Sequence, residues 1–205
     1  MPLVVVGLIN YGSGNIFSVR NAFTHLGVEC RLVSSSSELS GISHLVLPGV
    51  GAFAHCFAKL VSSGFVDPLN KWAIDECRPF LGICVGMQLL ADYGVELGGS
   101  VGLGFIPGVV EMIPKKDGLR IPHVGWNKVS FIKGTKNPYE CLDGEYYFDH
   151  SYYFKTKNPK NILATVNHGR DFVAAVSHGN IVGVQFHPEK SQTKGLMLLK
   201  NFLGI

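Results

Sequence analysis

The chain has 205 residues, the usual size of one folding domain, so a single domain over residues 1–205 is expected. Hydrophobic residues make up 46% of the chain and charged residues only 16%, which allows a large buried core and excludes disorder. The net charge of +3, from 18 basic and 15 acidic residues, is too small to indicate nucleic acid as the main partner.

No apolar run approaches the ~20 residues that a membrane helix needs, and the nearest, Leu3–Ile9, is far shorter. A cytoplasmic protein is therefore expected. The five cysteines are an odd number without CxxC spacing, which argues against a disulfide framework and against a cysteine-based zinc site. At least one thiol is expected to stay free.

The first half of the chain alternates short β-branched runs with segments of helical period, a pattern typical of βαβ units. The predicted strands are Leu3–Ile9, Glu29–Val33, Leu45–Leu47 and Pro79–Ile83. One helix is predicted from Asn15, which can cap it, to Gly27. A second helix begins at Phe53, and a third follows the fourth strand and continues to Gly94.

Beyond Gly104 the pattern changes to short alternating strands typical of antiparallel hairpins. They are predicted at Val109–Ile113, Val124–Ile132, Glu145–Asp149, Tyr152–Phe154, Ile162–Val166, Val173–Ser177 and Ile181–Gln185, before a closing helix at Lys194–Phe202. The expected architecture is a three-layer α/β/α doubly wound fold. Its central sheet is mostly parallel, with an additional antiparallel portion in the second half.

The pentapeptide Gly82-Ile83-Cys84-Val85-Gly86 has the form of a nucleophile elbow with sulfur in place of oxygen. The glycines let the thiol project from a sharp strand-to-helix turn. A cysteine at a helix N-terminus is favoured as thiolate, and the amide of Val85 points to where an oxyanion would form. The alternative is a buried core cysteine between glycines.

A histidine and an acid follow a later apolar strand, in the segment His187-Pro188-Glu189. Residues two apart in an extended segment face the same way, so Glu189 can hold the imidazole. The histidine can then take the proton of Cys84 and return it to a departing amine. The alternative is a histidine that merely ends a strand beside a surface acid.

A second glycine-rich turn, Pro48-Gly49-Val50-Gly51, follows the third predicted strand. Backbone amides in such a turn can approach a reacting carbonyl closely, and one lost oxyanion donor typically costs ~10² to 10³ in rate. The alternative is an ordinary strand-to-helix turn.

Together these residues resemble the class I glutamine amidotransferases, and within them the glutaminase subunits of imidazole glycerol phosphate synthase. Six motifs in the same order carry the resemblance along nearly the whole chain. They are Tyr11-Gly12-Ser13-Gly14-Asn15, Pro48-Gly49-Val50-Gly51-Ala52-Phe53, Gly82-Ile83-Cys84-Val85-Gly86-Met87-Gln88, Pro122-His123-Val124-Gly125-Trp126-Asn127, His150-Ser151-Tyr152 and Phe186-His187-Pro188-Glu189-Lys190-Ser191.

The resemblance implies that Cys84 attacks the side-chain amide of glutamine, that His187 is the acid and base, and that Glu189 orients it. The residues that it implies for glutamine binding are Gln88, Glu96, Ser151 and Tyr152, with a solvated loop acid as the alternative for Glu96. The oxyanion region that it implies is Val50, Gly51 and Val85. No cofactor and no metal are expected, since no HxxxH or HxH spacing is present.

The resemblance also implies a partner, a (β/α)₈ barrel synthase (cyclase) subunit that forms a heterodimer with this chain and uses the ammonia in histidine biosynthesis. Ammonia released into water near neutral pH would be mostly protonated, so a dry channel keeps it nucleophilic. The implied interface residues are Tyr11, Asn15, Trp126, Asn127 and Lys190, with core packing as the alternative for Trp126.

Two positions depart from the family pattern: Val85 replaces a leucine, and Asp149 replaces an apolar residue. They leave open a paralogous glutaminase that supplies ammonia for the amidation of nucleotide-linked sugars. A free-standing cysteine hydrolase such as a γ-glutamyl peptidase is a further alternative. The non-enzyme alternative, a nucleotide- or phosphate-binding module, is disfavoured because Phe17 stands where a dinucleotide fingerprint needs glycine.

Overall fold

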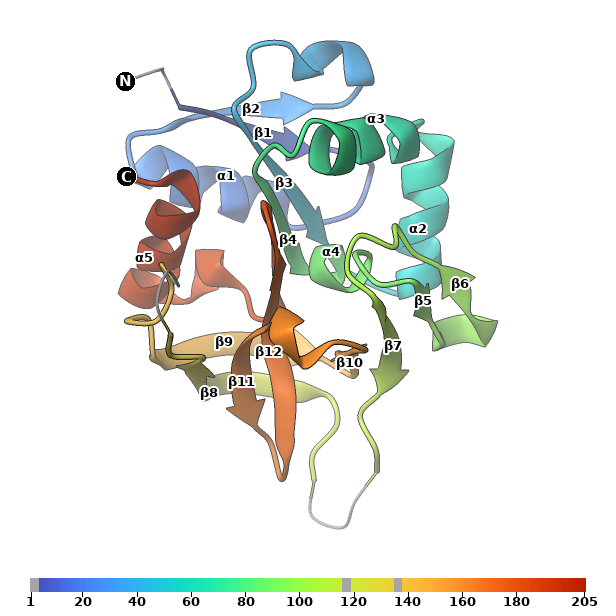
Figure 1. The fold of residues 1–205 in the computed structure, drawn as a ribbon, viewed down its shortest axis with the longest axis vertical. Coiled ribbons are helices and arrows are strands. Elements are labelled where there is room, and N and C mark those ends of the chain that lie inside the picture. The colour runs from blue at the N-terminus through green and yellow to red at the C-terminus, as the bar shows by residue number, and fades with distance from the viewer. Residues whose placement is uncertain (1–3, 116–118, 135–137) are drawn as a thin grey trace.

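The structure, a computed structural model, describes residues 4–115, 119–134 and 138–205. Its main sheet has nine strands among these residues. In spatial order they are β2 (Glu29–Val33), β1 (Val5–Ile9), β3 (His44–Gly49), β4 (Phe80–Cys84), β13 (Ile181–Val184), β12 (Asp171–His178), β11 (Ile162–Asn167), β8 (His123–Phe131) and β9 (Gly144–His150) (Figure 1).

The first five strands of that order are parallel, so their carboxyl ends share one rim of the sheet. β4 and β13 are buried at every residue, which explains their continuous apolar sequence. In register, Gly49 of β3 lies opposite Cys84 at the end of β4, and Val184 of β13 lies opposite Ile83. The turns after β3, β4 and β13 therefore meet at the same place.

The other strands of the main sheet pair antiparallel from β13 to β9, as predicted for the second half of the chain. A smaller sheet lies beside the main one. Its strands, in spatial order, are β10 (Tyr152–Thr156), β7 (Gly108–Met112), β5 (Tyr93–Gly94) and β6 (Ser100–Val101). Only Ser151 separates β9 of the main sheet from β10 of the smaller sheet.

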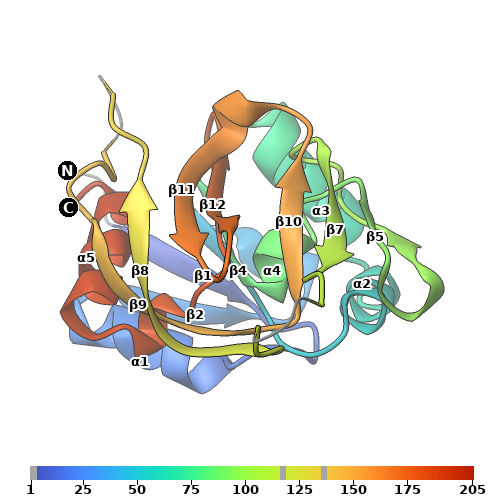
Figure 2. The same cartoon turned by 90° about the horizontal axis from the view of Figure 1, so that it is seen from below.

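Helices cover both faces of the main sheet, as the three-layer prediction requires. The helices α1 (Ile16–His25) and α5 (Gln192–Leu203) lie on one face, and α2 (Phe53–Ser62), α3 (Val66–Asn70) and α4 (Val85–Gln88) lie on the other (Figure 2). The short helix α3 and the π-turn Lys71–Asp75 after it were not predicted. Within the described ranges, no helix is long and apolar enough to span a membrane.

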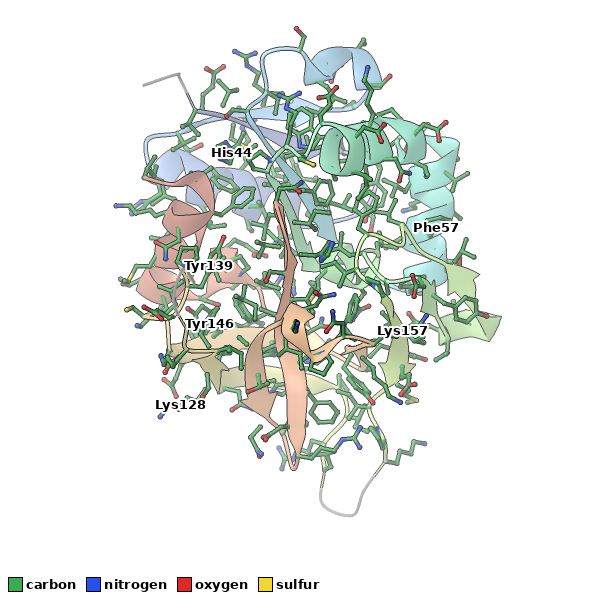
Figure 3. The ribbon with its side chains drawn as sticks, in the orientation of Figure 1. His44, Phe57, Lys128, Tyr139, Tyr146 and Lys157 are labelled. Carbon is green, nitrogen blue, oxygen red and sulfur yellow. The ribbon has the colours of Figure 1, made fainter. Side chains whose placement is uncertain are left out.

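Strand β9 packs its inward side chains against the segment that carries the candidate histidine. Tyr146, labelled in Figure 3, is fully buried according to its exposed surface, and its ring lies against Phe186 with centroids 4.2 Å apart. Its hydroxyl donates to the carbonyl oxygen of Leu142 at 2.9 Å. This packing fixes the residue immediately before His187.

The helix predicted after Cys84 is shorter than expected. It ends at Gln88, and the expected end at Gly94 instead lies in strand β5. The backbone carbonyl oxygens that would continue the helix instead accept hydrogen bonds from N–H groups of a later loop. The carbonyl of Leu89 accepts from Leu103, that of Leu90 from Ile106 and that of Ala91 from Gly104. A contact distant in sequence therefore terminates the helix.

Most other boundaries agree with the prediction to within a few residues. Asn15 is the N-cap residue of α1 as predicted, but its side chain makes no capping hydrogen bond. Within the described range the first strand begins at Val5, and the predicted start at Leu3 lies outside the described residues. The turn predicted at His178–Asn180 joins β12 to β13.

Gly86 is a position where a side chain would conflict with the fold. A Cβ at Gly86 would overlap the carbonyl oxygen of Leu47 on β3. We expect Gly86→Ala to lower the free energy of unfolding by about 3 kcal/mol or more, measured by urea denaturation. Gly134→Ala is the control because its Cβ would meet open space, and it should change stability by less than about 0.5 kcal/mol. Equal stability of the two variants would contradict this account.

Candidate active site

Cys84 lies at the end of β4 in a strained conformation. Its φ of 56° falls in the left-handed region, which costs a non-glycine residue about 1–3 kcal/mol. A Cβ at Gly82 would lie 2.5 Å from the carbonyl oxygen of Gly86, so the elbow needs both glycines for close backbone packing. The elbow turn predicted from the sequence is present, with the thiol side chain buried.

His187 and Glu189 form a buried pair. His187 Nδ1 lies 2.8 Å from Glu189 Oε1, and their side chains are 4% and 1% exposed. A carboxylate only accepts, so Nδ1 carries the hydrogen. Cys84 lines the same cleft as His187 and is close enough to raise the pKa of His187, so the predicted triad residues lie together. The expected extended geometry was wrong, however: Pro188–Lys190 form a 3₁₀ turn, and this turn brings Glu189 back to His187.

The turn after His187 is held in place from both sides. The backbone N–H of His187 donates to the carbonyl oxygen of Tyr147 on β9 at 2.9 Å. The Ser191 hydroxyl donates to the carbonyl oxygen of His187 at 2.6 Å and accepts from the N–H of Tyr147 at 3.0 Å. Ser191 thus positions the histidine, a role that sequence reasoning did not assign to it.

The environment of His187 favours its charged form. Burial lowers the pKa of His187, but hydrogen bonds to Cys84 and Glu189 and the charges on both groups outweigh it and raise the pKa to about 10. The second carboxylate oxygen, Glu189 Oε2, is buried and has no hydrogen-bond partner among the described residues. Among the described residues, His187 is therefore the group that offsets the cost of burying the Glu189 carboxylate.

The turn after β3 is held from beneath by the first glycine-rich segment. The Ser13 hydroxyl donates to the carbonyl oxygen of Val50 at 2.7 Å, and the Cys56 thiol donates to it at 3.3 Å. The Tyr11 hydroxyl donates to the carbonyl oxygen of Pro48 at 3.0 Å. Because the peptide is trans, the N–H of Gly51 points away from the clamped Val50 carbonyl. The glycine-rich segment thus supports this turn.

A cleft of about 320 Å³ opens beside the elbow. It brings together the predicted catalytic pair Cys84 and His187 with all of the predicted oxyanion and glutamine-binding residues. Its lining is Val50, Gly51, Cys84, Val85, Gln88, Glu96, Pro122, Asp149, His150, Ser151, Tyr152, His187 and Lys190. Glu189 supports the cleft from behind His187.

Gln88 connects two walls of the cleft. Its Nε2 donates to the carbonyl oxygen of Tyr152 and to Gln185 Oε1, each at 3.0 Å. Gln185 Nε2 in turn donates to Cys84 Sγ at 3.9 Å. Gln185 was missed from the sequence, although it is a fully buried polar residue that follows an apolar strand directly.

Glu96 reaches the cleft but is also engaged in the fold. Its Oε2 accepts from the backbone N–H of Phe53 at 2.7 Å, at the start of α2. It is thus not a free loop acid, and it links the smaller sheet to the helix that follows the Val50 turn.

The predicted interface residues have different surroundings. Trp126 is 46% exposed, which excludes the core alternative, and Lys190 Nζ lies 5.3 Å from the ring of Tyr147. Tyr11 is buried beneath the Pro48 carbonyl. The remaining two, Asn15 and Asn127, are half-buried, and neither lines the cleft.

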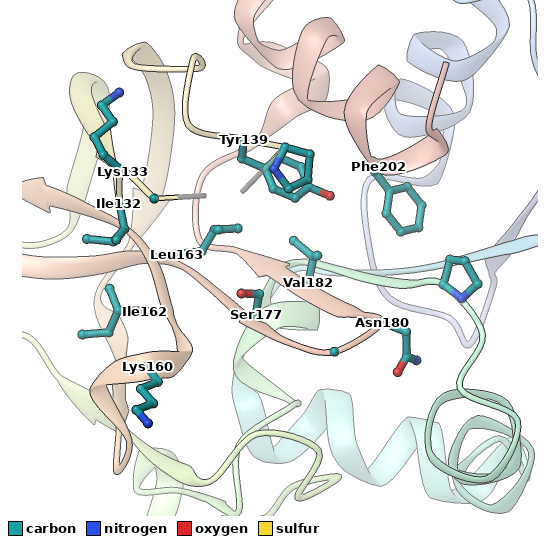
Figure 4. Close-up of a pocket in the computed structure, with 14 residues that line it drawn as sticks. Ile132, Lys133, Tyr139, Lys160, Ile162, Leu163, Ser177, Asn180, Val182 and Phe202 are labelled. Atoms are coloured by element: carbon teal, nitrogen blue, oxygen red, sulfur yellow. The ribbon is translucent and has the colours of Figure 1, made fainter. Parts of the chain in front are cut away.

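A second hollow of about 490 Å³ lies at the opposite rim (Figure 4). It adjoins Pro79 and Asn180, which precede β4 and β13, so it is far from the carboxyl ends of these strands. Of its two lysines, Lys133 pairs with Asp143 at 2.9 Å. The larger hollow is therefore not where the predicted catalytic groups meet.

Comparison with known proteins shows the family of the chain. Residues 7–204 match the family model described as glutamine amidotransferase class-I. The imidazole glycerol phosphate synthase subunit HisH of Rhodospirillum rubrum is 46% identical in an alignment of 211 positions that covers 97% of this chain and 97% of that protein. The Arabidopsis thaliana imidazole glycerol phosphate synthase hisHF, chloroplastic, is 41% identical. The alignment covers 97% of this chain and 34% of the length of the Arabidopsis protein. A solved glutamine amidotransferase has a TM-score of 0.76 at 22% identity, covering 98% of this chain and 99% of its own.

The chain belongs to the class I glutamine amidotransferases, since the family model spans nearly all of it. Within this class it belongs with the HisH subunits of imidazole glycerol phosphate synthase. The resemblance drawn from the six motifs is thereby confirmed, as is the α/β fold. The chain is an enzyme of this class, so the binding-module alternative is set aside.

The raised pKa of His187 predicts a pH dependence of stability. A native pKa of about 10, above the ordinary 6.5, means that the folded state holds the proton more tightly than the unfolded state. This stabilisation is fully present below pH 6.5 and is lost as the pH rises through about 10. The advantage of wild type over His187→Gln in free energy of unfolding should therefore shrink from about pH 7 to 10 in urea titrations. An advantage that grows with pH would contradict the assignment.

Proposed function

We propose that the chain is the glutaminase subunit of imidazole glycerol phosphate synthase, and that Cys84, His187 and Glu189 hydrolyse glutamine. The observation that carries the proposal is the buried His187–Glu189 pair, which shares one cleft with a cysteine in a strained conformation. The class and the HisH relatives support the same reaction.

In the proposed mechanism, His187 Nε2 already holds the proton of Cys84 when Sγ attacks the side-chain carboxamide carbon of glutamine, as the raised pKa of His187 favours. His187 returns the proton to the amide nitrogen, the C–N bond breaks, and ammonia leaves a thioester on Cys84. Water, deprotonated by His187, then attacks the thioester carbon. The C–S bond breaks, glutamate is released, and the proton stays on His187, as it was at the start of the cycle. One glutamine and one water thus give one glutamate and one ammonia.

The oxyanion of both steps is proposed to bind backbone amides of Val50, Gly51 and Val85, which line the cleft. The proposed contacts of glutamine itself are Gln88, Glu96, Ser151 and Tyr152. Gln88 uses its Nε2 for Tyr152 and Gln185, so its Oε1 remains as an acceptor for the substrate. Asp149, the unusual acid, is exposed at the mouth of the same cleft.

A (β/α)₈ barrel cyclase subunit is proposed as the partner and the consumer of the ammonia, in the cytoplasm. Exposed apolar side chains support a docking surface on the cleft side, since such residues are costly to leave in water. They are Val50, Val124 and Trp126, at 43%, 54% and 46% exposure. The name of the Rhodospirillum rubrum relative calls it a subunit of a synthase, and the longer Arabidopsis relative matches this chain over only 34% of its length.

The nucleophile assignment is tested by Cys84→Ala, because no other group on the proposed path can form the thioester. We expect glutamate release from glutamine to fall by at least about 10⁴-fold, with the unfolding midpoint retained. Cys141→Ser is the matched control, since that thiol is exposed and outside the cleft. Glutaminase activity retained in Cys84→Ala would overturn the assignment.

The partner assignment is tested by assaying wild type alone and with a purified cyclase subunit and its acceptor substrate. We expect low turnover alone and a rise of about tenfold or more in the complex, because the clamped Val50–Gly51 turn must reorient to present its amides. Full activity of the isolated chain would contradict this coupling. Cys84-dependent activity without any response to the cyclase would instead favour a synthase that amidates nucleotide-linked sugars.

A further inference from the structure

Two buried histidines lie opposite each other on β8 and β9, and the one on β9 also lines the cleft. His123 and His150 are register partners, 4% and 7% exposed. His123 Nδ1 lies 3.0 Å from His150 Nε2. His150 Nδ1 lies 2.8 Å from the carbonyl oxygen of Tyr152, and Asn127 Nδ2 lies 3.1 Å from His123 Nε2. The three side chains thus form a continuous chain that ends on the backbone of a proposed glutamine-binding residue.

The contact with the Tyr152 carbonyl determines which atoms donate and which accept in this chain of hydrogen bonds. A carbonyl oxygen only accepts, so His150 Nδ1 carries a hydrogen and, in the neutral ring, Nε2 is an acceptor. His123 must then donate through Nδ1 and accept at Nε2. Burial, followed by the charges of neighbouring histidines, lowers the pKa of His123 to about 3. Burial is also the largest cause that lowers the pKa of His150, to about 4. Both rings are therefore neutral at neutral pH.

The Asn127 end independently requires the same direction. Asn127 Oδ1 accepts from the N–H of Lys128 at 2.8 Å, so its Nδ2 is the atom that faces His123. The second hydrogen of Nδ2 donates to the carbonyl oxygen of Asn167 at 2.8 Å. The ring of His123 is also fixed, because it is stacked on Phe148 at 4.5 Å and on His168 at 4.1 Å.

The Tyr152 carbonyl joins this chain to the nucleophile. It accepts from both His150 and Gln88, and Gln88 is bonded through Gln185 to Cys84. Burying a polar group without a hydrogen-bond partner costs free energy. Each ring nitrogen of His123 and His150 has such a partner. The two histidines therefore donate and accept hydrogen bonds in a fixed order that ends at the Tyr152 carbonyl. Apolar side chains at these positions could not do this.

We propose that Asn127, His123 and His150 are positioning residues that hold the Tyr152 carbonyl, and with it the Ser151–Tyr152 segment, where glutamine binds. The proposal deepens the proposed function and rests on it. The three side chains do not touch the reacting atoms. They act through the backbone of Tyr152 and the amide of Gln88, so their loss affects glutamine binding more than the chemical step.

Two substitutions at His150 separate this role from mere space filling. The amide nitrogen of asparagine is as many bonds from Cα as Nδ1 of histidine, whereas that of glutamine matches Nε2. His150→Asn therefore keeps a donor for the Tyr152 carbonyl, and His150→Gln does not. We expect KM for glutamine to be about tenfold higher in His150→Gln than in His150→Asn, with kcat within about threefold. Equal KM values would overturn the proposal.

A spectroscopic measurement on the wild type tests the direction without any substitution. Imidazole ¹⁵N shifts at neutral pH should show both His123 and His150 as neutral Nδ1–H tautomers. An Nε2–H tautomer on either ring would overturn the proposal. His168→Phe keeps a ring stacked on His123 but lies outside the chain, so its KM should match wild type. Absence of glutaminase activity in the wild type would overturn the proposed function instead. The tautomers would then still test the order of donors and acceptors from Asn127 to Tyr152.

Discussion

The close approach of the elbow backbone to strand β3 is the contact on which the site depends. Gly86 packs so tightly against Leu47 that no side chain fits between them. This contact holds Cys84 at a left-handed φ at the end of β4, level with Gly49 across the sheet. The parallel sheet thereby places the proposed nucleophile next to the turn whose backbone amides are proposed to bind the oxyanion.

Local patterns in the sequence were sufficient for the fold class, for the elbow cysteine and for the His187–Glu189 pair. The β-branched runs predicted the buried parallel strands, because strands covered on both faces need no polar residues. The elbow motif was predicted from its glycines, whose small size the packing at Gly82 and Gly86 explains. The cleft residues came from the family resemblance, and their roles remain proposals.

What the sequence could not predict depends on contacts between distant segments. The end of α4 at Gln88 is determined by a loop more than ten residues later, which no local periodicity reveals. The pairing of His187 with Glu189 was expected for an extended strand but arises from a 3₁₀ turn. Gln185 and Ser191 act through bonds to partners elsewhere in the chain, so their residue types alone gave no signal.

The passage of the chain from β9 to β10 has a mechanical consequence. Ser151 is the single residue between a strand of the main sheet and a strand of the smaller one, and it lines the cleft. Cys84 and His187 belong to the main sheet and its turns, whereas Tyr152 begins the smaller sheet. The cleft therefore lies where the two sheets meet, so its width depends on the angle between them, whereas the proposed catalytic residues all lie on the side of the main sheet.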